Sequence, residues 1–505
     1  MTNAPLNRDA VTDGVTQGSA NTPPAAPGER RKLKADIAVI GAGSGGLSVA
    51  AGASMLGLNV VLFEKGEMGG DCLNYGCVPS KALLTAGRKA QTFRDAEKFG
   101  LTAAEPQIDW LRVRDHVKGV IETIAPVDSQ ERFEGLGVTV IREGARFQDK
   151  DTIVSDSVQV KARRIVVATG STAFIPPIPG LKETPHLTNE DIFDIDVLPK
   201  HLVILGGGPI GAELGQAFRR LGSEVTIIEM GRALGRAEPE HAAVAVAHMR
   251  QEGVEILEGH KAVSVSQSAD GVVVKTETES GETKEIAGSH LLVAVGRRAV
   301  LNSLDLEAGG VTTKGDGIET KANLRSVSNP RVWAVGDAAG RGQFTHLAGW
   351  HASVFVRNAL FKSRTKADSL PLPAVTYLEP EVAQVGLTEA EAREAYGDSV
   401  KTAKFEFEEN DRAIAERANH GGAKIVTDKK GVILGASVVG EGAGDIIQIV
   451  GVAMSNGLKI RALTNFISPY PTRAEVLKRA ASKWYEAVVF GKSAKRLVGA
   501  LQRVP

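Results

Sequence analysis

Two stretches of the chain share one hydrophobic pattern, in which a short apolar run leads into a glycine-rich turn and then into a longer segment of helical composition. In the first stretch, residues 36–64, the run IAVI is followed by GAGSGG, by the segment LSVAAGASM and by a second apolar run, VVLFE. Short apolar runs bounded by glycine turns are typical of buried parallel strands, and the longer segment between them predicts a helix. The pattern therefore predicts a strand–helix–strand unit.

The second stretch, residues 201–229, repeats this unit in register. Glycines at such turns let the backbone approach a pyrophosphate, the helix N-terminus offers N–H donors, and an acid at the end of the second strand accepts from a ribose hydroxyl. A whole unit repeated in register predicts two dinucleotide-binding sites. The repeat lies 165 residues along the chain and matches Gly41, Gly43, Gly46 and Glu64 with Gly206, Gly208, Gly211 and Glu229.

The acid of the second unit bears on the choice of nicotinamide cofactor. A carboxylate accepts a hydrogen bond from a free ribose 2′-hydroxyl but repels the 2′-phosphate of NADP, so Glu229 favours NADH. Arg232 and Arg236 follow closely and keep NADPH open as the alternative, although both residues also fit a solvated loop.

Composition and charge narrow the class of protein. The chain has 505 residues, 43% of them hydrophobic, with 60 Lys and Arg against 60 Asp and Glu. A chain of this length is expected to form roughly two to four domains. The balanced charge does not favour nucleic acid as a partner, because nucleic-acid binding depends on an excess of basic residues.

The N-terminal region and the apolar first unit bear on location. Residues 1–33 are rich in small and polar residues and predict a disordered leader that ends in a basic cluster at residues 30–32. Residues 37–63 carry no charge, but their six glycines argue against a transmembrane helix. We therefore expect a cytoplasmic protein, and the sequence disfavours membrane contact.

The two cysteines of the chain lie close together, directly after the first unit. They are Cys72 and Cys77 in the segment GGDCLNYGCVPSK. In a regular helix, residues five apart are separated by about 7.5 Å along the axis, more than the roughly 4.4–6.8 Å between Cα atoms in a disulfide. A bridge therefore requires a distorted turn, which Gly76 permits, and such a strained bridge is readily reduced, with Lys81 favouring the thiolate. Two unpaired thiols in a turn are the alternative.

Two dinucleotide sites and a dithiol together imply a route for electrons. Hydride can pass from a nicotinamide to a second carrier that then reduces a disulfide. Because NAD cannot usefully reduce NAD, the first site is expected to hold FAD. No structural metal site is expected, although Cys72 and Cys77 could capture a metal ion transiently as thiolates.

These segments, together with GARF at residues 144–147, ATGS at 168–171, VGR at 295–297 and VGD at 335–337, resemble the class I pyridine nucleotide-disulfide oxidoreductases. That family includes dihydrolipoamide dehydrogenase, glutathione reductase and mercuric reductase. The resemblance implies an α/β fold with two Rossmann-like dinucleotide-binding domains, for FAD and NAD(P), and a C-terminal α+β dimerisation domain. We expect the FAD domain at residues 34–185 and 309–361, the NAD(P) domain at 186–308, the dimerisation domain at 371–505, and a homodimer.

The resemblance also implies roles for single residues. Cys72 would be the interchange thiol that meets the substrate, and Cys77 the charge-transfer thiol against the flavin. Lys81 and Glu213 would form an ion pair near flavin N5 and the nicotinamide, and Asp337 would hold the FAD ribityl chain. The expected cofactor-binding residues are Gly41, Gly43, Gly46, Glu64, Lys65, Gly70, Asp71, Lys81, Ala145, Thr169, Gly170, Ser171, Gly206, Gly208, Gly211, Glu213, Glu229, Gly296, Gly336 and Asp337.

One segment departs from the family pattern. Where disulfide-reducing members carry His-Pro-Thr followed by Glu, this chain has Tyr470-Pro471-Thr472 and Glu475. An unperturbed Tyr has a pKa of about 10 against about 6.5 for His, so it is a poor base near pH 7. Burial would raise the Tyr pKa further. Proton transfer to lipoamide or glutathione is therefore disfavoured.

This substitution bears on the electron acceptor. Mercuric reductases also have Tyr at this position, and a soft metal ion needs thiolate ligands more than a proton shuttle. Against that reading, the chain lacks both the cysteine pair of their C-terminal tail and their cysteine-bearing N-terminal domain. We expect a mercuric reductase-like enzyme, with a dihydrolipoamide dehydrogenase-like enzyme as the alternative. A flavin-binding redox sensor is an alternative of another class, favoured if turnover stays below about one per minute.

Two further features carry weaker signals. His346, close after Asp337, is expected either near the flavin or as a helix-start residue satisfied by hydrogen bonds. The tail from Ser482 to Arg503 alternates apolar and basic residues, which fits a surface helix of the dimerisation domain better than a membrane-surface helix.

Overall fold

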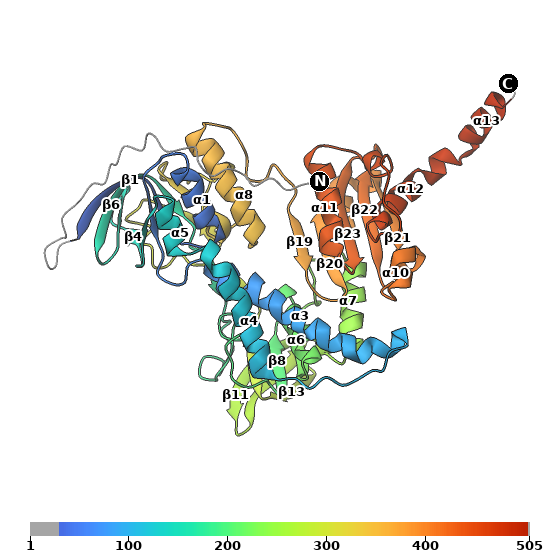
Figure 1. Cartoon of the computed structure of the whole chain (residues 1–505), viewed down its shortest axis with the longest axis horizontal. Helices are drawn as coiled ribbons and strands as arrows, with labels where there is room; N and C mark the ends of the chain where they lie inside the picture. Colours follow the sequence, from blue (N-terminus) through green and yellow to red (C-terminus); the bar gives the residue numbers. More distant parts are fainter. Residues whose placement is uncertain (1–29, 503–505) are drawn as a thin grey trace, which may run out of the picture.

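The computed structural model describes residues 30–502, so leader residues 1–29 lie outside the described residues. The chain forms two α/β units, each built on parallel strands, and a third α+β unit built on an antiparallel sheet (Figure 1). The α/β fold class expected from the sequence, with its C-terminal α+β part, is confirmed.

The first sheet joins two distant parts of the chain. Its strand order is β3-β2-β1-β6-β5-β4, and β18 pairs with β6. Strands β1, β2, β3, β6 and β18 pair in parallel, whereas β4 and β5 form an antiparallel extension. The strands are β1 (Arg31–Ile40), β2 (Val60–Phe63), β3 (Thr139–Ile141), β4 (Arg146–Phe147), β5 (Thr152–Val154), β6 (Val158–Val167) and β18 (Val332–Ala334).

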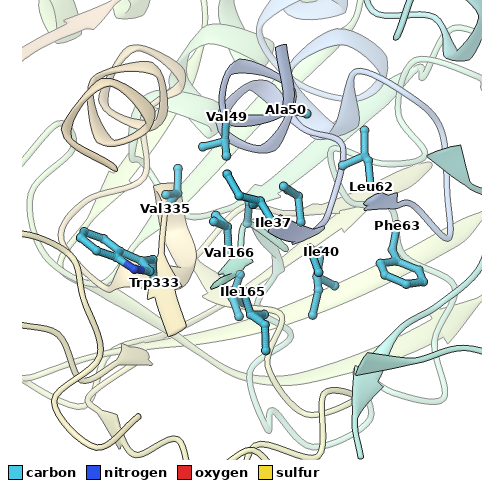
Figure 2. Close-up of a cluster of buried hydrophobic side chains, with 14 of the residues drawn as sticks. Ile37, Ile40, Val49, Ala50, Leu62, Phe63, Ile165, Val166, Trp333 and Val335 are labelled. Atoms are coloured by element: carbon cyan, nitrogen blue, oxygen red, sulfur yellow. The ribbon is translucent and has the colours of Figure 1, made fainter. Parts of the chain in front are cut away.

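Apolar residues from both parts of the chain form the core of this sheet. Ile37 on β1 and Val166 on β6 are fully buried, and Trp333 on β18 packs close to them (Figure 2). Helices α1 (Ser44–Ser54) and α8 (Thr345–Phe355) contact each other over one face, and Val49 of α1 lies in the same cluster (Figure 2). This packing anchors the carboxyl ends of β1 and β18, where parallel sheets bind their ligands.

The second sheet contains the second predicted unit. Its order is β10-β9-β8-β14, with all pairs parallel, and a three-stranded antiparallel sheet, β11-β12-β13, lies beside it. Its strands and helices are β8 (His201–Leu205), α6 (Pro209–Arg220), β9 (Glu224–Glu229), α7 (Pro239–Gln251), β10 (Glu255–Glu258), β11 (His260–Ser268), β12 (Gly271–Thr278), β13 (Thr283–Gly288) and β14 (His290–Val293).

Two long helices from the first part of the chain pack against the second unit. Helix α3 (Cys77–Arg94) contacts α6 and α4 (Trp110–Ile124), and all three lie in the middle of the molecule (Figure 1). A Cβ atom on Gly87 of α3 would lie 3.2 Å from the carbonyl oxygen of Ala217 on α6, so the two helix backbones approach closely there. This crossing brings the start of α3 to the start of α6.

The third unit is a five-stranded antiparallel sheet in the order β19-β20-β23-β22-β21. Helices α11 and α12 pack against it, and α13 follows at the end of the chain. Its elements are β19 (Pro373–Thr376), β20 (Glu381–Gly386), α9 (Glu389–Tyr396), β21 (Val400–Glu406), α10 (Asp411–Ala415), β22 (Gly422–Asp428), β23 (Ile433–Gly440), α11 (Ala443–Ser455), α12 (Glu475–Val489) and α13 (Lys492–Leu501).

Two features of the fold bear on expectations from the sequence. Strand β1 begins at Arg31 and pairs with β6 from that residue on, so the first strand starts three residues before the expected boundary at Lys34. The uncharged stretch 37–63 forms strand, helix and strand in succession. Within residues 30–502, no helix has the length and apolar character needed to cross a membrane.

Candidate active site

The two glycine-rich turns have the same geometry. In the first turn, a Cβ atom on Gly46 would lie 1.9 Å from the carbonyl oxygen of Gly41, so only glycine lets α1 start this close to β1. A Cβ atom on Gly43 would meet nothing within 4 Å. In the second turn, a Cβ atom on Gly211 would lie 2.0 Å from the carbonyl oxygen of Gly206, and a Cβ atom on Gly208 would meet nothing within 4 Å. Each turn therefore leaves room for a phosphate beside a helix N-terminus.

The acids at the strand ends also match each other. Glu64 accepts hydrogen bonds from the N–H of Ala42 at 2.6 Å and of Gly66 at 2.7 Å. Glu229 accepts hydrogen bonds from the N–H of Gly207 in the second turn at 2.7 Å and from the N–H of Gly231, just after β9, at 2.8 Å. Each carboxylate is thereby fixed at the end of its strand, and its remaining lone pairs can accept from a ribose hydroxyl.

A polar network lies where β18 ends. Ser171 donates to Asp337 Oδ2 at 2.6 Å, and Arg297 donates from Nε to Ser171 Oγ at 2.8 Å. The Arg297 guanidinium also donates to Asp71 Oδ1 at 2.8 Å and to Asn189 Oδ1 at 3.0 Å. Burial raises the pKa of Asp337, and its hydrogen bond from Ser171 opposes that shift.

These residues fit FAD. Asp337 is a half-buried acceptor that would suit the hydroxyls of a ribityl chain, and the Thr169 hydroxyl is buried with no hydrogen-bond partner within residues 30–502. The open side of Gly43 and the fixed Glu64 suit the pyrophosphate and the adenine ribose. Lys65 is exposed and follows Glu64. Ala145 is 9% exposed, and a Cβ atom added to its neighbour Gly144 would lie 3.9 Å from the Cβ atom of Lys65.

The two cysteines lie at the junction of two helices. Helix α2 (Gly70–Asn74) carries Cys72, and α3 begins at Cys77. Between them Gly76 leaves the helical region at φ −124°, ψ −112°, which is the distorted turn that the cysteine spacing predicted. Both cysteines are unpaired in the structure.

The environments of the two sulfur atoms differ. A hydrogen bond from the Cys72 thiol lowers the pKa of Cys77 to about 6, with further help from Thr345 and from the charge of Lys81. The same hydrogen bond and burial raise the pKa of Cys72. The Thr345 hydroxyl lies 3.5 Å from Cys77 Sγ. At neutral pH the reduced pair therefore holds a thiolate at Cys77 and a thiol at Cys72.

An ion pair joins the two α/β units next to the thiols. Lys81 on α3 and Glu213 on α6 are 2.7 Å apart, and the Glu213 side chain is only 6% exposed. Tyr377, just after β19, donates its backbone N–H to the other Glu213 oxygen at 2.9 Å, and Lys81 Nζ lies 4.5 Å from its ring centroid. All three units thus contribute to this site.

A cavity of about 820 Å³ connects these groups. His346 also lines the cavity, and its Nε2 makes a 2.9 Å hydrogen bond to the carbonyl oxygen of Pro373. The histidine therefore lies at the cavity and has a hydrogen-bond partner. Arg297, Asn189, Thr345 and Tyr377 are among the lining residues that the sequence did not predict, and Arg297 lies in the VGR motif at residues 295–297. The expected site residues in the lining are Gly43, Asp71, Cys72, Cys77, Lys81, Gly170, Ser171, Glu213, Gly336 and Asp337.

The tyrosine that departs from the family pattern does not reach this cavity within its own chain. The Tyr470 hydroxyl donates to Asp411 at 2.8 Å, and this hydrogen bond and the Asp411 charge raise the tyrosine pKa. Glu475, the acid that follows Tyr470 in the family pattern, pairs with Arg479 at 2.9 Å. Neither residue lines the cavity around the thiols.

The fold and the site together define an oxidoreductase in which two dinucleotide turns serve one reactive dithiol. Residues 35–352 match the pyridine nucleotide-disulphide oxidoreductase family, and residues 372–481 match the dimerisation domain of that family. The chain belongs to this family, whose members use FAD and NAD(P)H, and it is an enzyme of this kind.

Relatives of the chain include proteins with two different activities. Mercuric reductase from Streptomyces lividans is 35% identical over 456 residues, which cover 88% of this chain and 95% of that protein. Dihydrolipoyl dehydrogenase from Thermus scotoductus is 36% identical over 465 residues, covering 90% and 98%. A solved structure of the HOCl-induced flavoprotein disulfide reductase RclA from Escherichia coli has a TM-score of 0.79 at 26% identity, covering 88% and 99%. The chain is a flavoprotein disulfide reductase of this group.

Proposed function

We propose that the protein is an FAD-dependent NAD(P)H oxidoreductase that passes electrons through Cys72 and Cys77 to a thiol-reactive acceptor, as a mercuric reductase does. The proposal rests on two thiols whose pKa values are shifted in opposite directions and which line the same cavity as the Lys81–Glu213 ion pair. FAD, when bound, would relay two electrons from the nicotinamide to the sulfur pair. The Lys81–Glu213 ion pair would fix one positive and one negative charge beside the bound FAD.

The protonation of the reduced pair suits a soft metal ion. Reduction of a Cys72–Cys77 disulfide by two electrons leaves one proton on the pair at neutral pH, because the pKa of Cys77 is lowered to about 6 and that of Cys72 is raised. Cys77 then offers a thiolate at once, and Cys72 releases its proton when a metal ion binds to it. Soft metal ions such as Hg(II) prefer thiolate ligands.

The observation that carries the choice of acceptor is the hydrogen bond from Tyr470 to Asp411. A phenol that donates to a carboxylate and has a raised pKa is poorly suited to take a proton from Cys72. In the proposed homodimer, Tyr470 would approach the thiols only from the partner subunit, since it lies outside the cavity of its own chain. Metal reduction needs this proton transfer less than disulfide reduction does.

A comparison of acceptors tests the proposal. Purified holoenzyme receives NADH without oxygen, together with Hg(II) in excess thiol, lipoamide, or Cu(II), which is included because a solved structure of RclA is a Cu(II) complex. We expect Hg(II) to drive NADH oxidation at least about tenfold faster than lipoamide does. No stimulation by Hg(II) would exclude the metal proposal. Repeating the assay with NADPH tests the preference for NADH, which rests on Glu229 and is contradicted if NADPH gives the higher kcat/KM.

A dihydrolipoyl dehydrogenase-like function is the second candidate, favoured by the 36% identical relative of that name and by the acid Glu229. If Tyr470 is what excludes dithiol substrates, Tyr470→His should raise lipoamide-dependent turnover by at least about tenfold, because general acid–base catalysis contributes about 10²–10⁴-fold. The measurement is steady-state NADH oxidation with lipoamide. Tyr470→Phe is the matched control and should not gain. A histidine variant that stays as slow as the phenylalanine variant would show that this residue does not set the acceptor.

A further inference from the structure

The end of the chain forms two helices with different surroundings. Helix α12 packs against β21 and β22, and its Trp484 donates from Nε1 to Thr427 at 2.9 Å. Helix α13 has no buried residue, and Figure 1 shows it projecting away from the antiparallel sheet. Gly491 separates the two with extended backbone at φ −69°, ψ 164°. The tail from Ser482 onward, which was expected to form one surface helix, is divided between the end of α12 and α13, and α13 lies beyond the residues that match the dimerisation domain.

One face of α13 is apolar and exposed. Ala494, Leu497, Val498 and Leu501 follow the spacing i, i+3, i+4, i+7, which places them in one stripe about 100° wide. The exposed fractions of the three larger side chains are 61%, 54% and 58%. Phe490, just before α13, is 66% exposed. Apolar side chains gathered in this way indicate an interaction surface rather than scattered surface residues.

The opposite face of α13 is basic. Lys492, Lys495 and Arg496 are exposed and lie away from the apolar stripe on the helix circumference. None of them forms an ion pair within residues 30–502. The sequence has no Asp or Glu between Glu486 and Pro505. The segment therefore carries uncompensated positive charge beside its apolar stripe.

We propose that α13 docks the enzyme on an anionic lipid surface. A short helix with an apolar stripe and a basic face lies in the plane of a membrane interface, with its apolar side chains among the acyl chains and its cations among anionic headgroups. At about 15 Å in length it would bind weakly and reversibly. Two copies in a homodimer would strengthen the attachment. A second α13 is a poorer partner, because it would bring the same uncompensated cations together. This inference does not depend on the identity of the electron acceptor.

Vesicle flotation of the full-length holoenzyme tests the inference. The vesicles contain phosphatidylcholine alone or with about one third phosphatidylglycerol. We expect at least tenfold more binding to the anionic vesicles, and we expect 1 M salt to remove it, since the Debye length then falls to about 3 Å. Leu497→Asp with Leu501→Asp should remove the apolar attachment, and Lys495→Glu with Arg496→Glu should remove the electrostatic one.

A matched control and a second measurement distinguish this surface from an interface between subunits. Gly499→Ser lies on the polar side of α13, where an added Cβ meets nothing within 4 Å, and should bind vesicles as the unchanged protein does. NADH oxidation with soluble acceptors should be the same in all these variants. Equal binding to both vesicle types, or no binding, would overturn the inference. So would a loss of the dimer mass by light scattering in the Asp variants, because a second copy would then cover the stripe.

Discussion

Replacing Cys72 with Ser should lower turnover with the metal or disulfide acceptor by at least about a thousandfold while NADH still bleaches the yellow colour of the purified holoenzyme. Serine cannot form a disulfide with Cys77 or bind a soft metal as a thiolate, so electrons would reach the cavity and go no further. The measurement pairs anaerobic stopped-flow absorbance with steady-state NADH oxidation. A dithiol route requires that NADH still reduces the holoenzyme while turnover with the acceptor is lost.

Thr92→Ala is a suitable control for this variant. Thr92 lies on the same helix as Cys77 but on its exposed face, away from the cavity. The control should keep both readouts, which would exclude a general effect of altering α3. Unchanged acceptor turnover in Cys72→Ser would contradict the dithiol route. Loss of both readouts would instead indicate that the substitution disturbs the cofactor site.

Replacing Lys81 with Met should raise the pKa of Cys77 and reduce turnover by at least about a hundredfold. The positive charge of Lys81 is one of the causes that hold the Cys77 pKa at about 6, after the hydrogen bonds from Cys72 and Thr345. The thiolate is present above that pKa and is lost as the pH falls through it, so removing the cation should move the transition about one pH unit upward. Glu213 would lose its 2.7 Å partner in a nearly buried position.

Alkylation measures this shift without depending on turnover. The reduced protein is treated with iodoacetamide between pH 4 and 10 (roughly the range in which a Cys titrates), and the modified Cys77 peptide is quantified by mass spectrometry. Lys81→Arg keeps the positive charge and should keep the low transition. An unchanged transition in Lys81→Met would show that the hydrogen bonds alone set the Cys77 pKa, and that Lys81 acts elsewhere.

Local patterns were sufficient to predict the parts of the site that lie within one continuous segment. Gly41, Gly43 and Gly46 are needed where a helix begins close to a strand, and that steric requirement is visible in sequence. The spacing of Cys72 and Cys77 likewise required a break in the helix, which occurs at Gly76. These features depend on backbone geometry over a few residues.

Contacts between distant segments could not be predicted in this way. Arg297 holds Asp71 and Ser171 because β15 (Arg297–Ala299) pairs with β7 (Ser171–Ala173), and no pattern in either short strand specifies that pairing. Tyr377 meets Glu213 only because β19 of the third unit reaches the start of α6. The sequence shows that Tyr470 replaces the histidine of the family pattern. It does not show that Tyr470 hydrogen-bonds to Asp411, because Asp411 lies 59 residues earlier in the chain.

The sequence by itself determined the α/β class, the two dinucleotide turns, the reactive cysteine pair and the amphipathic pattern of the tail, because each is encoded by spacing within a single segment. The contact of Lys81 with Glu213 was implied only by the family resemblance and by no spacing within one segment. Tertiary structure decided that contact, the lower pKa of the Cys77 thiol and the exposure of α13. These outcomes depend on the crossing of α3 over α6, on the environment of each sulfur atom, and on where the last packed helix ends. Such packing arises only when segments far apart in the chain are brought together.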